Sequence, residues 1–420
     1  MAGESADLAP AGGTPGVRVR IFLAALIALA GGGALAFSFW HAATPDLAEI
    51  CALARRGEFD RAEALLSDRL RDDPGDPKAH LLMAQFSMDR PDPRPEAALE
   101  HLGRLRPKTR EEEALLRFSE GKARYQLKEY GAAEALWYRA LELDPRVPEA
   151  GWALLDLLDF EGRNDEAHEL GMRLFEHEPH PRDRVRLLLE MVRMEVEHID
   201  NGSRVQTFEP AWKADPSNLR LGMAVGFALL RSGEADRGLE VLKGLLDRNP
   251  DSPQARETWL AALMDAHRPE QLKAEVARLP GALREDPRFA RFLGAVADGD
   301  RDWPTAIRMY RRALEFRPYD GATLYRLRLA ARASGDAEEL RRADDRLRDF
   351  KDAESRLADA RKEAMDEPTL GVTPRPALYH KLASLRERVG RLDEARAWHR
   401  LVLRDAPGDP TSLAALERLK

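Results

Sequence analysis

The sequence is short of the residues from which covalent cross-links and many metal sites are built. It holds one cysteine, Cys51, among 420 residues, so an intramolecular disulfide and a zinc site built on two or four cysteines are both excluded. Aromatic residues make up only 7% of the chain, whereas 33% of its residues are charged. This balance is typical of helices with solvated outer faces rather than of β-sandwiches. The composition therefore predicts an all-α protein.

The chain also lacks a concentrated basic surface. Its formal net charge is −7 at pH 7, and this charge is spread along the whole sequence. Domains that bind nucleic acids gather lysine and arginine on one face, so we expect no nucleic-acid partner. The cations are 55 arginines and 11 lysines. Together with the many alanines and glycines, this indicates a GC-rich coding sequence, which is typical of many bacteria.

Common catalytic motifs are missing too. The sequence has no Walker phosphate loop, no G-x-S-x-G and no H-E-x-x-H. The tightest pair of histidines is His177 and His180 in "HEPH", where only Glu176 and Glu178 could add ligands nearby, and a solvated turn is the simpler interpretation. We therefore expect no enzymatic activity, no catalytic residue, no bound metal or cofactor and no small-molecule substrate.

A long apolar run stands near the start of the chain. Residues 21–40, "IFLAALIALAGGGALAFSFW", carry no charge over twenty positions, which as a helix span about 30 Å, the thickness of a bilayer core. Arg18 and Arg20 precede the run, and Trp40 ends it where an indole suits the interface. These features predict a transmembrane helix at 21–40, preceded by a disordered tail at 1–20 that is rich in Ala, Gly and Pro.

The flanking charges predict the orientation of this helix. Arg18 and Arg20 favour an N-terminus in the cytoplasm, although Arg55 and Arg56 partly balance the count. The main alternative is a signal peptide cleaved near the A-x-A pattern at 34–36, which would release a secreted protein, and a further one is a buried helix of a soluble domain. With the anchor or the signal peptide, the bulk of the chain lies outside the cytoplasm, in the periplasm if the cell has an outer membrane.

The rest of the chain repeats with a period near 34 residues, which is typical of stacked helix pairs. The repeat is marked by prolines at 74, 107, 145, 179, 216, 250, 287, 318 and 407. Small residues stand twelve positions before such prolines, at Ala62, Ala133, Ala167, Gly238, Ala306 and Ala395, and twenty-four before them, at Gly121, Gly226, Gly294 and Ala383. Glycines stand seventeen before them, at Gly57, Gly162, Gly233 and Gly390.

Each mark has a physical role. The small residues allow the two antiparallel helices of a pair to approach within about 8–10 Å. The glycine ends the first helix in a left-handed conformation, and the proline ends the second helix because it cannot continue the hydrogen-bond pattern. The repeat therefore predicts helix, turn, helix and stop in each unit.

This pattern resembles the tetratricopeptide repeat, most closely at 114–145 and 287–318. The resemblance covers residues 45–420 and implies a right-handed α-solenoid of about ten helix pairs, with the array at 45–363. Two units depart from it, the one ending at Pro216 with "HIDNGSRVQTFEP" and the one ending at Pro287, whose second helix we expect to break at Pro280.

The C-terminal part departs in its own way. Residues 336–363 predict one long charged helix, with a coiled-coil partner as an alternative to an elongated repeat helix. A linker with three prolines at 364–376 isolates a final repeat and capping helix at 377–420. In the cap we expect Leu413, Leu416 and Leu419 to share the buried side.

The resemblance also implies a concave groove lined by the first helix of each unit. The groove positions carry aromatic residues in one half and basic residues in the other, and they could bind an extended or helical peptide. The alternative is that several of the aromatic rings pack between neighbouring units. The residues are Phe118, Lys122, Tyr125, Trp152, Asp156, Met223, Phe227, Arg288, Arg291, Tyr325 and Arg332.

These observations lead to two hypotheses of function. The first is a membrane-anchored scaffold or adaptor that binds partner proteins or peptides, similar in layout to tetratricopeptide proteins of the bacterial envelope that serve assembly or export. The second is a regulatory or enzymatic subunit whose site is completed by a partner.

Overall fold

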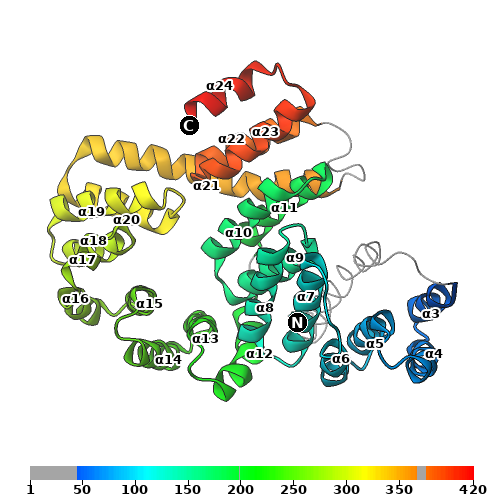
Figure 1. Cartoon of the computed structure of the whole chain (residues 1–420). Helices are drawn as coiled ribbons and strands as arrows, with labels where there is room; N and C mark the ends of the chain where they lie inside the picture. Colours follow the sequence, from blue (N-terminus) through cyan, green and yellow to red (C-terminus); the bar gives the residue numbers. More distant parts are fainter. Residues whose placement is uncertain (1–44, 198, 367–374) are drawn as a thin grey trace, which may run out of the picture. The chain divides into compact units, whose positions relative to one another are not determined.

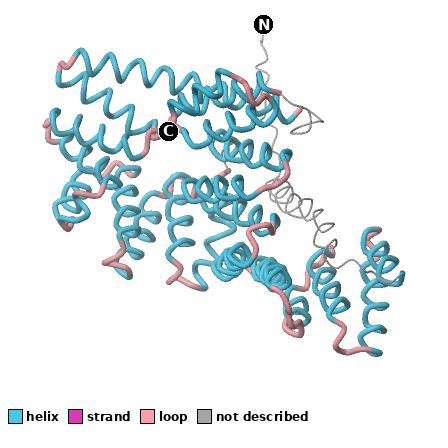
Figure 2. The backbone as a smooth tube through the Cα atoms, turned by 45° about the horizontal axis from the view of Figure 1, so that its top comes forward, coloured by secondary structure: helices cyan, strands magenta, loops and turns pink. Residues whose placement is uncertain are grey.

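A computed structural model describes residues 45–197, 199–366 and 375–420. Within these residues every regular element is a helix, which confirms the all-α fold class (Figure 2). No helix among them is long and apolar enough to cross a membrane, and the predicted span at 21–40 lies outside the described residues. The chain divides into two compact units, unit 1 up to Leu154 and unit 2 from Leu155 onward.

Unit 1 is built from successive helix pairs (Figure 1). Its helices are α3 (Pro45–Arg55), α4 (Phe59–Asp72), α5 (Pro77–Asp89), α6 (Pro95–Leu102), α7 (Arg110–Gln126), α8 (Tyr130–Leu143) and the first half of α9 (Pro148–Glu161). Within this unit α3 packs on α4, α5 on α6 and α7 on α8.

Unit 2 holds the end of α9 and all later helices. They are α10 (Asn164–His177), α11 (Pro181–Val196), α12 (Asn201–Ala214), α13 (Leu219–Arg231), α14 (Ala235–Arg248), α15 (Pro253–Asp265), α16 (Pro269–Ala277), α17 (Gly281–Arg284), the 3₁₀ turn η2 (Pro287–Phe289), α18 (Ala290–Gly299), α19 (Trp303–Phe316), α20 (Gly321–Ser334), α21 (Ala337–Met365), α22 (Pro376–Val389), α23 (Leu392–Asp405) and α24 (Pro410–Arg418). The pairs α13–α14, α18–α19, α20–α21 and α22–α23 pack as the repeat predicts.

The predicted stop signals are confirmed at most of the marked prolines, and several helices also begin with a capping side chain. Several first helices begin after a side chain that accepts a hydrogen bond from a backbone N–H of the first turn, as Asp76 does for α5, Asn218 for α13 and Asp320 for α20. Helices α4, α8, α10, α12, α14, α19 and α23 each end two residues before a marked proline. The proline ladder thus locates the helix ends closely.

The turn inside a pair is left-handed at all four predicted glycines. The φ angles are +81° at Gly57, +75° at Gly162, +95° at Gly233 and +90° at Gly390. The same repeat position holds Lys128 (φ +64°) and Arg301 (φ +61°) in two other units, although left-handed backbone is strained for side chains with a Cβ. The turn geometry therefore belongs to the repeat and overrides the local residue preference.

The small residues lie where helices cross closely. The five alanines that stand twelve positions before a marked proline, Ala62, Ala133, Ala167, Ala306 and Ala395, have 0% exposure. A Cβ added to Gly226 would lie 2.4 Å from Cγ of Leu242 on the second helix of its pair. The predicted role of these positions as packing gaps is confirmed.

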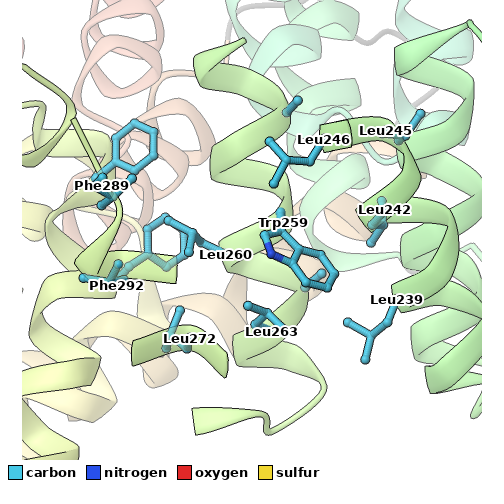
Figure 3. Packing of buried hydrophobic residues seen from close by; sticks show 14 residues of the cluster. Leu239, Leu242, Leu245, Leu246, Trp259, Leu260, Leu263, Leu272, Phe289 and Phe292 are labelled. Atoms are coloured by element: carbon cyan, nitrogen blue, oxygen red, sulfur yellow. The ribbon is translucent and has the colours of Figure 1, made fainter. Parts of the chain in front are cut away.

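The apolar core follows the stack from one pair to the next. In the centre of unit 2 it joins α14, α15, α16, η2 and α18, with Trp259, Leu260 and Phe292 in the middle (Figure 3). A further cluster continues through α19 and α20 to the first half of α21, where Ala343 and Leu347 are buried. Each pair is therefore held by its neighbours, as in other repeat proteins.

The unit ending at Pro216 is not a simple hairpin. Helix α11 packs on α10, α21 and α23, whereas α12 packs on α13. The start of α12 also approaches the end of α9, where the Phe160 and Phe208 rings lie 4.9 Å apart and Arg204 donates to the carbonyl oxygen of Asp159 at 3.0 Å. The sequence "HIDNGSRVQTFEP" thus marks the point where the chain leaves the regular repeat.

Three other predictions concern the later helices. The break at Pro280 is confirmed, because α16 ends at Ala277 and the four-residue α17 follows. The long charged helix is α21, with 29 residues, and its packing partners in the described structure include α20, α22 and α11 of the same chain. The expected face of the terminal helix α24 is wrong for Leu413, which is 50% exposed, whereas Leu416 is half-buried and Leu419 is buried as expected, next to Ser412 and Ala415.

Candidate functional site

The predicted groove residues of unit 1 lie on α7 and α9 and are all half-buried. The Lys122 ammonium pairs with Asp89 at the end of α5. The Tyr125 ring lies 5.2 Å from Tyr130 and 5.7 Å from Trp137, centroid to centroid. The Lys122 and Tyr125 side chains therefore contribute to packing between helices of unit 1.

The other two predicted groove residues of unit 1 are Phe118 and Trp152. The backbone carbonyl of Phe118 accepts a hydrogen bond from the Trp137 indole at 3.2 Å, which fixes this part of α7 against α8. Both predicted side chains remain partly open to solvent. They stay candidate contact residues.

Two apolar candidates of unit 2 belong to its core. Met223 and Phe227 on α13 pack against the hydrophobic cluster of α14 and α15. The Arg231 guanidinium covers the Phe227 ring at 5.5 Å from its centroid. For these residues the packing alternative describes the structure better than an open groove.

Two of the basic residues of the predicted groove, Arg288 and Arg291, already lie close to acidic side chains. Arg288 makes a bidentate contact with Asp286, with a shortest distance of 2.6 Å. Arg291 stacks at 4.7 Å from the Phe292 centroid, and its nearest carboxylates, on Glu257 and Asp320, are 3.5 and 4.0 Å away. The basic half of the predicted groove is therefore less positive than the sequence predicts.

Asp156 is the acidic candidate, and its environment disfavours the charged form. Burial is the main cause, and the nearby Glu190 carboxylate adds to it, so that the pKa of Asp156 rises to about 7 despite the opposing charge of Arg193. A carboxyl of this kind is partly protonated at neutral pH and can donate as well as accept a hydrogen bond.

The two remaining candidates are exposed and lie on one face of α20. Tyr325 is 45% exposed, Leu329 follows one turn later at 38%, and Arg332 is also exposed. The spacings of four and three residues align these side chains along the helix. We call Tyr325, Leu329 and Arg332 the α20 stripe; the sequence analysis found its ends and missed Leu329.

The metal-binding alternative finds no geometric support in the described residues. No three His, Cys, Asp or Glu side chains in the described ranges are arranged to hold a metal ion. In "HEPH", the Nδ1 atom of His177 lies 2.8 Å from the carbonyl oxygen of Arg173, within its own helix. Cys51 is buried, and this burial raises its thiol pKa.

The structure also brings together charged residues that the sequence analysis did not single out. They join α10 and α11 to the turns and helices near the end of unit 2 (Figure 1). We call them the closing network: Asp165, His168, Glu195, Arg317, Tyr319, Arg386, Arg391, Asp393 and Glu394.

Glu195 of α11 is the centre of the closing network. One carboxylate oxygen lies 2.5 Å from Arg386 at the end of α22, and the other lies 2.6 Å from Arg391 in the turn before α23. Arg386 also pairs with Glu394, and both side chains are 0% exposed. Burial alone would raise the pKa of Glu195, but the two guanidinium groups outweigh it and hold that pKa well below its usual range.

His168 of α10 extends this network to the first turn of α23. Its Nε2 atom lies 2.7 Å from Asp393 and its Nδ1 atom 2.8 Å from Glu394. Burial, the largest influence, lowers the histidine pKa, but the hydrogen bonds to the two carboxylates reverse this and raise it to about 9. At neutral pH both ring nitrogens therefore carry protons and donate to carboxylates.

A third part of the network lies at the turn between α19 and α20. The Tyr319 hydroxyl donates to Asp165 of α10 at 3.0 Å, and Arg317 pairs with the same carboxylate at 3.2 Å. The Arg391 guanidinium stacks on the Tyr319 ring, 3.4 Å from its centroid. Burial raises the pKa of Tyr319 to about 12, so the hydroxyl keeps its proton.

Further contacts beside the closing network join α21 and α23 to α10 and α11. Arg361 of α21 donates to the carbonyl oxygen of Leu189 at 3.2 Å and pairs with Glu197 just beyond α11. Arg400 of α23 pairs with Glu176 of α10. Unit 2 is thus closed on itself by contacts between residues more than 150 positions apart in sequence.

One signal of this closure exists in the sequence. The residue twenty-one positions before the repeat proline is Leu158, Leu229 or Ala297 in three units, all of them buried, and it is Arg386 in the last unit. A cation at a core position implies a buried partner. The signal is weak, because the unit ending at Pro145 has Arg124 there, which is 41% exposed and pairs with a surface glutamate.

Comparison with known proteins finds similar solved structures but no matching family. No protein-family model matches the chain, and no curated protein matches it. Among solved structures, the chain is similar to one in the APC/C hetero-tetramer Cut9–Hcn1, with 15% identity, 88% of each chain covered and a TM-score of 0.32. It is also similar to a tetratricopeptide repeat protein from Parabacteroides merdae, with 11% identity, 73% of this chain and 98% of that chain covered and a TM-score of 0.31.

A third similar structure is that of Pseudomonas aeruginosa pilF, with 18% identity, 50% of this chain and 94% of that chain covered and a TM-score of 0.25. Identities and TM-scores this low bring no partner or role from these proteins to the chain. The description of unit 1 and unit 2 as tetratricopeptide-like therefore rests on their own geometry, in particular the left-handed turns, the buried alanines and the helix ends before proline.

Proposed function

We propose that this protein is a membrane-anchored scaffold that binds partner proteins or peptides through the exposed faces of its first helices, in assembly or export at the bacterial envelope. In this proposal residues 21–40 anchor the chain, the N-terminus faces the cytoplasm, and both repeat units lie on the other side of the membrane. The protein contributes binding, and chemistry is left to its partners.

The observation that carries the proposal is the α20 stripe. Tyr325 and Leu329 expose 45% and 38% of their surface, and an arginine follows one turn later on the same face. Tyrosine and arginine are enriched among the side chains that dominate binding energy at protein interfaces. The aromatic ring loses little conformational entropy on binding, which favours its use as an anchor.

The stripe is presented by a rigid helix. The opposite face of α20 is buried, with Leu324 and Leu327 packed in the cluster that joins α19 and α21. A binding surface that is already ordered has less entropy to lose on association than a mobile loop has. This supports α20 as a preformed contact surface.

The binding proposal is tested by capture from membranes. The full chain, with an affinity tag after Lys420, is compared with a Tyr325→Ala/Leu329→Ala variant. Truncation of an interface anchor costs about 1–3 kcal/mol, so we expect capture of the partners to fall by about tenfold or more. The matched control is Leu392→Ala/Leu413→Ala, which removes leucines that are 39% and 50% exposed elsewhere.

The control must retain the partners that the stripe variant loses. Equal recovery of every partner by the wild type, the stripe variant and the control would contradict the proposal for α20. Circular dichroism of each purified variant establishes that the helical fold is intact, so that a loss of capture reports binding.

The anchoring proposal has its own test. The full chain should sediment with membranes and resist extraction at high pH, whereas a variant lacking residues 21–40 should not. A reporter fused after Lys420 should be active only outside the cytoplasm. Cytoplasmic activity of that fusion would overturn the orientation and leave the binding proposal standing.

A further inference from the structure

The centre of the closing network in unit 2 is buried but incompletely satisfied. Arg386 and Glu394 are 0% exposed and pair with each other, yet Nε of Arg386 and Oε2 of Glu394 are buried without a hydrogen-bond partner in the described structure. Buried polar atoms that lack partners lose their hydration without replacement. In an opened state water would satisfy both atoms.

The charged composition of the closing network also favours a junction that can open. Ion pairs taken out of water gain little net stability, because desolvation offsets most of their attraction, yet they fix the register of the parts they join. The closing network therefore aligns α10 and α11 with α22 and α23 accurately while its charged contacts contribute a modest net free energy. Such a contact suits a junction that separates and re-forms in the same place.

The helix stack is least regular in another part of unit 2. Helix α16 has nine residues, where the second helices α14 and α19 have fourteen. It is followed by Pro280, the four-residue α17 and the three-residue turn η2. In Figure 1 this segment lies across unit 2 from the junction of α11 with α21. A small change in backbone angles at residues 278–287 would move the helices on either side of it relative to each other.

We propose that the closing network is a conformational latch, and that unit 2 exchanges between a closed form, held by Glu195, Arg386, Arg391 and His168, and an open form that bends at residues 278–287. Opening separates α10 and α11 from α21, α22 and α23. It also changes the curvature of the helices from α13 to α20 and therefore the shape of the surface around the α20 stripe.

The consequence for binding rests on the proposed function. The curvature of a helical repeat array sets the shape of its binding surface. A partner that fits only one curvature would shift the latch equilibrium toward that form, and the state of the latch would change the affinity for the partner by the same factor. The latch itself is independent of any partner and can be tested without one.

The test measures the distance between α10 and α23 in the full chain. Spin labels are attached at Glu176→Cys and Arg400→Cys in a Cys51→Ala background, and the distance distribution is recorded by pulsed electron paramagnetic resonance. Labelling removes the Glu176–Arg400 pair, whose side chains are 52% and 51% exposed, and an ion pair this exposed contributes little. The closed form should give one short-distance population.

The decisive perturbation is Glu195→Gln, which keeps the shape of the side chain but removes the charge shared by Arg386 and Arg391. We expect the ratio of open to closed molecules to rise by at least about tenfold, seen as a second population at longer distance. The matched control is Glu339→Gln, because Glu339 also bridges two arginines, Arg311 and Arg342, and lies away from the closing network. The control should leave the distance distribution unchanged.

Two results would overturn the latch. One is a folded Glu195→Gln protein that keeps a single short distance, which would make the closure ordinary core packing. The other is equal broadening in the control, which would make the effect general destabilisation. If Glu195→Gln fails to fold, Asp393→Asn at the 38% exposed edge of the network provides a milder perturbation, judged by the same criterion.

Failed partner capture by the α20 stripe would refute the proposed function alone, because the distance measurement involves no partner.

Discussion

Removal of Arg386 should destabilise the end of unit 2 far more than removal of an ordinary arginine. Its side chain is completely buried and contacts both Glu195 and Glu394. An Arg386→Met variant leaves the buried Glu394 and the half-buried Glu195 with fewer cations, although Glu195 keeps Arg391 and Glu394 keeps His168. Breaking a buried ion pair costs about 3–5 kcal/mol, and the retained partners place this case near the lower end, at about 3 kcal/mol.

A double variant separates lost attraction from uncompensated charge. In Arg386→Met/Glu394→Met both buried charges are replaced by apolar side chains that fill similar volume. Such replacements are often neutral or stabilising, so the double variant should recover at least half of the loss. His168 keeps Asp393 as a partner in this variant, which limits the damage to the rest of the network.

The assay is native-state hydrogen exchange of the backbone amides in α22 and α23. A loss of about 3 kcal/mol should accelerate their exchange by about 150-fold in the single variant. Arg342→Met serves as the control, because this arginine is 62% exposed and should change exchange by less than about threefold. Acceleration of less than tenfold in the single variant, or a double variant that exchanges faster than the single, would refute the reasoning.

Three further predictions follow from the geometry. Gly226→Ala should lower the free energy of unfolding of unit 2 by about 1–3 kcal/mol in chemical denaturation, because its Cβ would lie 2.4 Å from Leu242, whereas Gly281→Ala, with open space around it, should be neutral; equal effects would contradict the packing argument. Arg301→Gly should leave the free energy of unfolding unchanged or raise it by up to about 1 kcal/mol, because glycine adopts the φ of +61° without strain. A clear loss in thermal denaturation would show that contacts of the arginine side chain outweigh the backbone strain. The folded pKa of His168 is raised from 6.5 to about 9, so its contribution, about 3 kcal/mol at most, is fully present below pH 6.5 and is lost as pH rises through 9; a denaturation series from pH 6 to 10 should show this loss in the wild type and not in His168→Gln.

Local signals made the helix pairs predictable from the sequence. Proline stops, glycine turns and small crossing residues act on the backbone within a few positions, so their effects can be read without knowledge of the rest of the fold. The φ of +90° at Gly390 and the complete burial of Ala395 are examples, since both follow from distance to Pro407 alone. The same logic located the break at Pro280.

The long-range contacts of unit 2 could not be predicted from the sequence. Nothing near Glu195 indicates that it meets Arg386 and Arg391, because the pairing depends on how the curvature of many helix pairs adds up along unit 2. The groove prediction was limited for the same reason. Phe227 and Tyr325 both occupy groove positions of the repeat, but neighbouring helices cover Phe227 and leave Tyr325 45% exposed.

The most direct test of the proposed function is site-specific photo-cross-linking in living cells. A photoreactive phenylalanine analogue replaces Tyr325 in the full chain, and the same analogue replaces Leu413 in a second sample, where exposure is similar. If the α20 stripe is a protein-binding surface, illumination should yield a discrete cross-linked partner from position 325 that is absent from position 413. Cross-linking that is missing at position 325, or identical at the two positions, would contradict the proposal that this helical array binds proteins through α20.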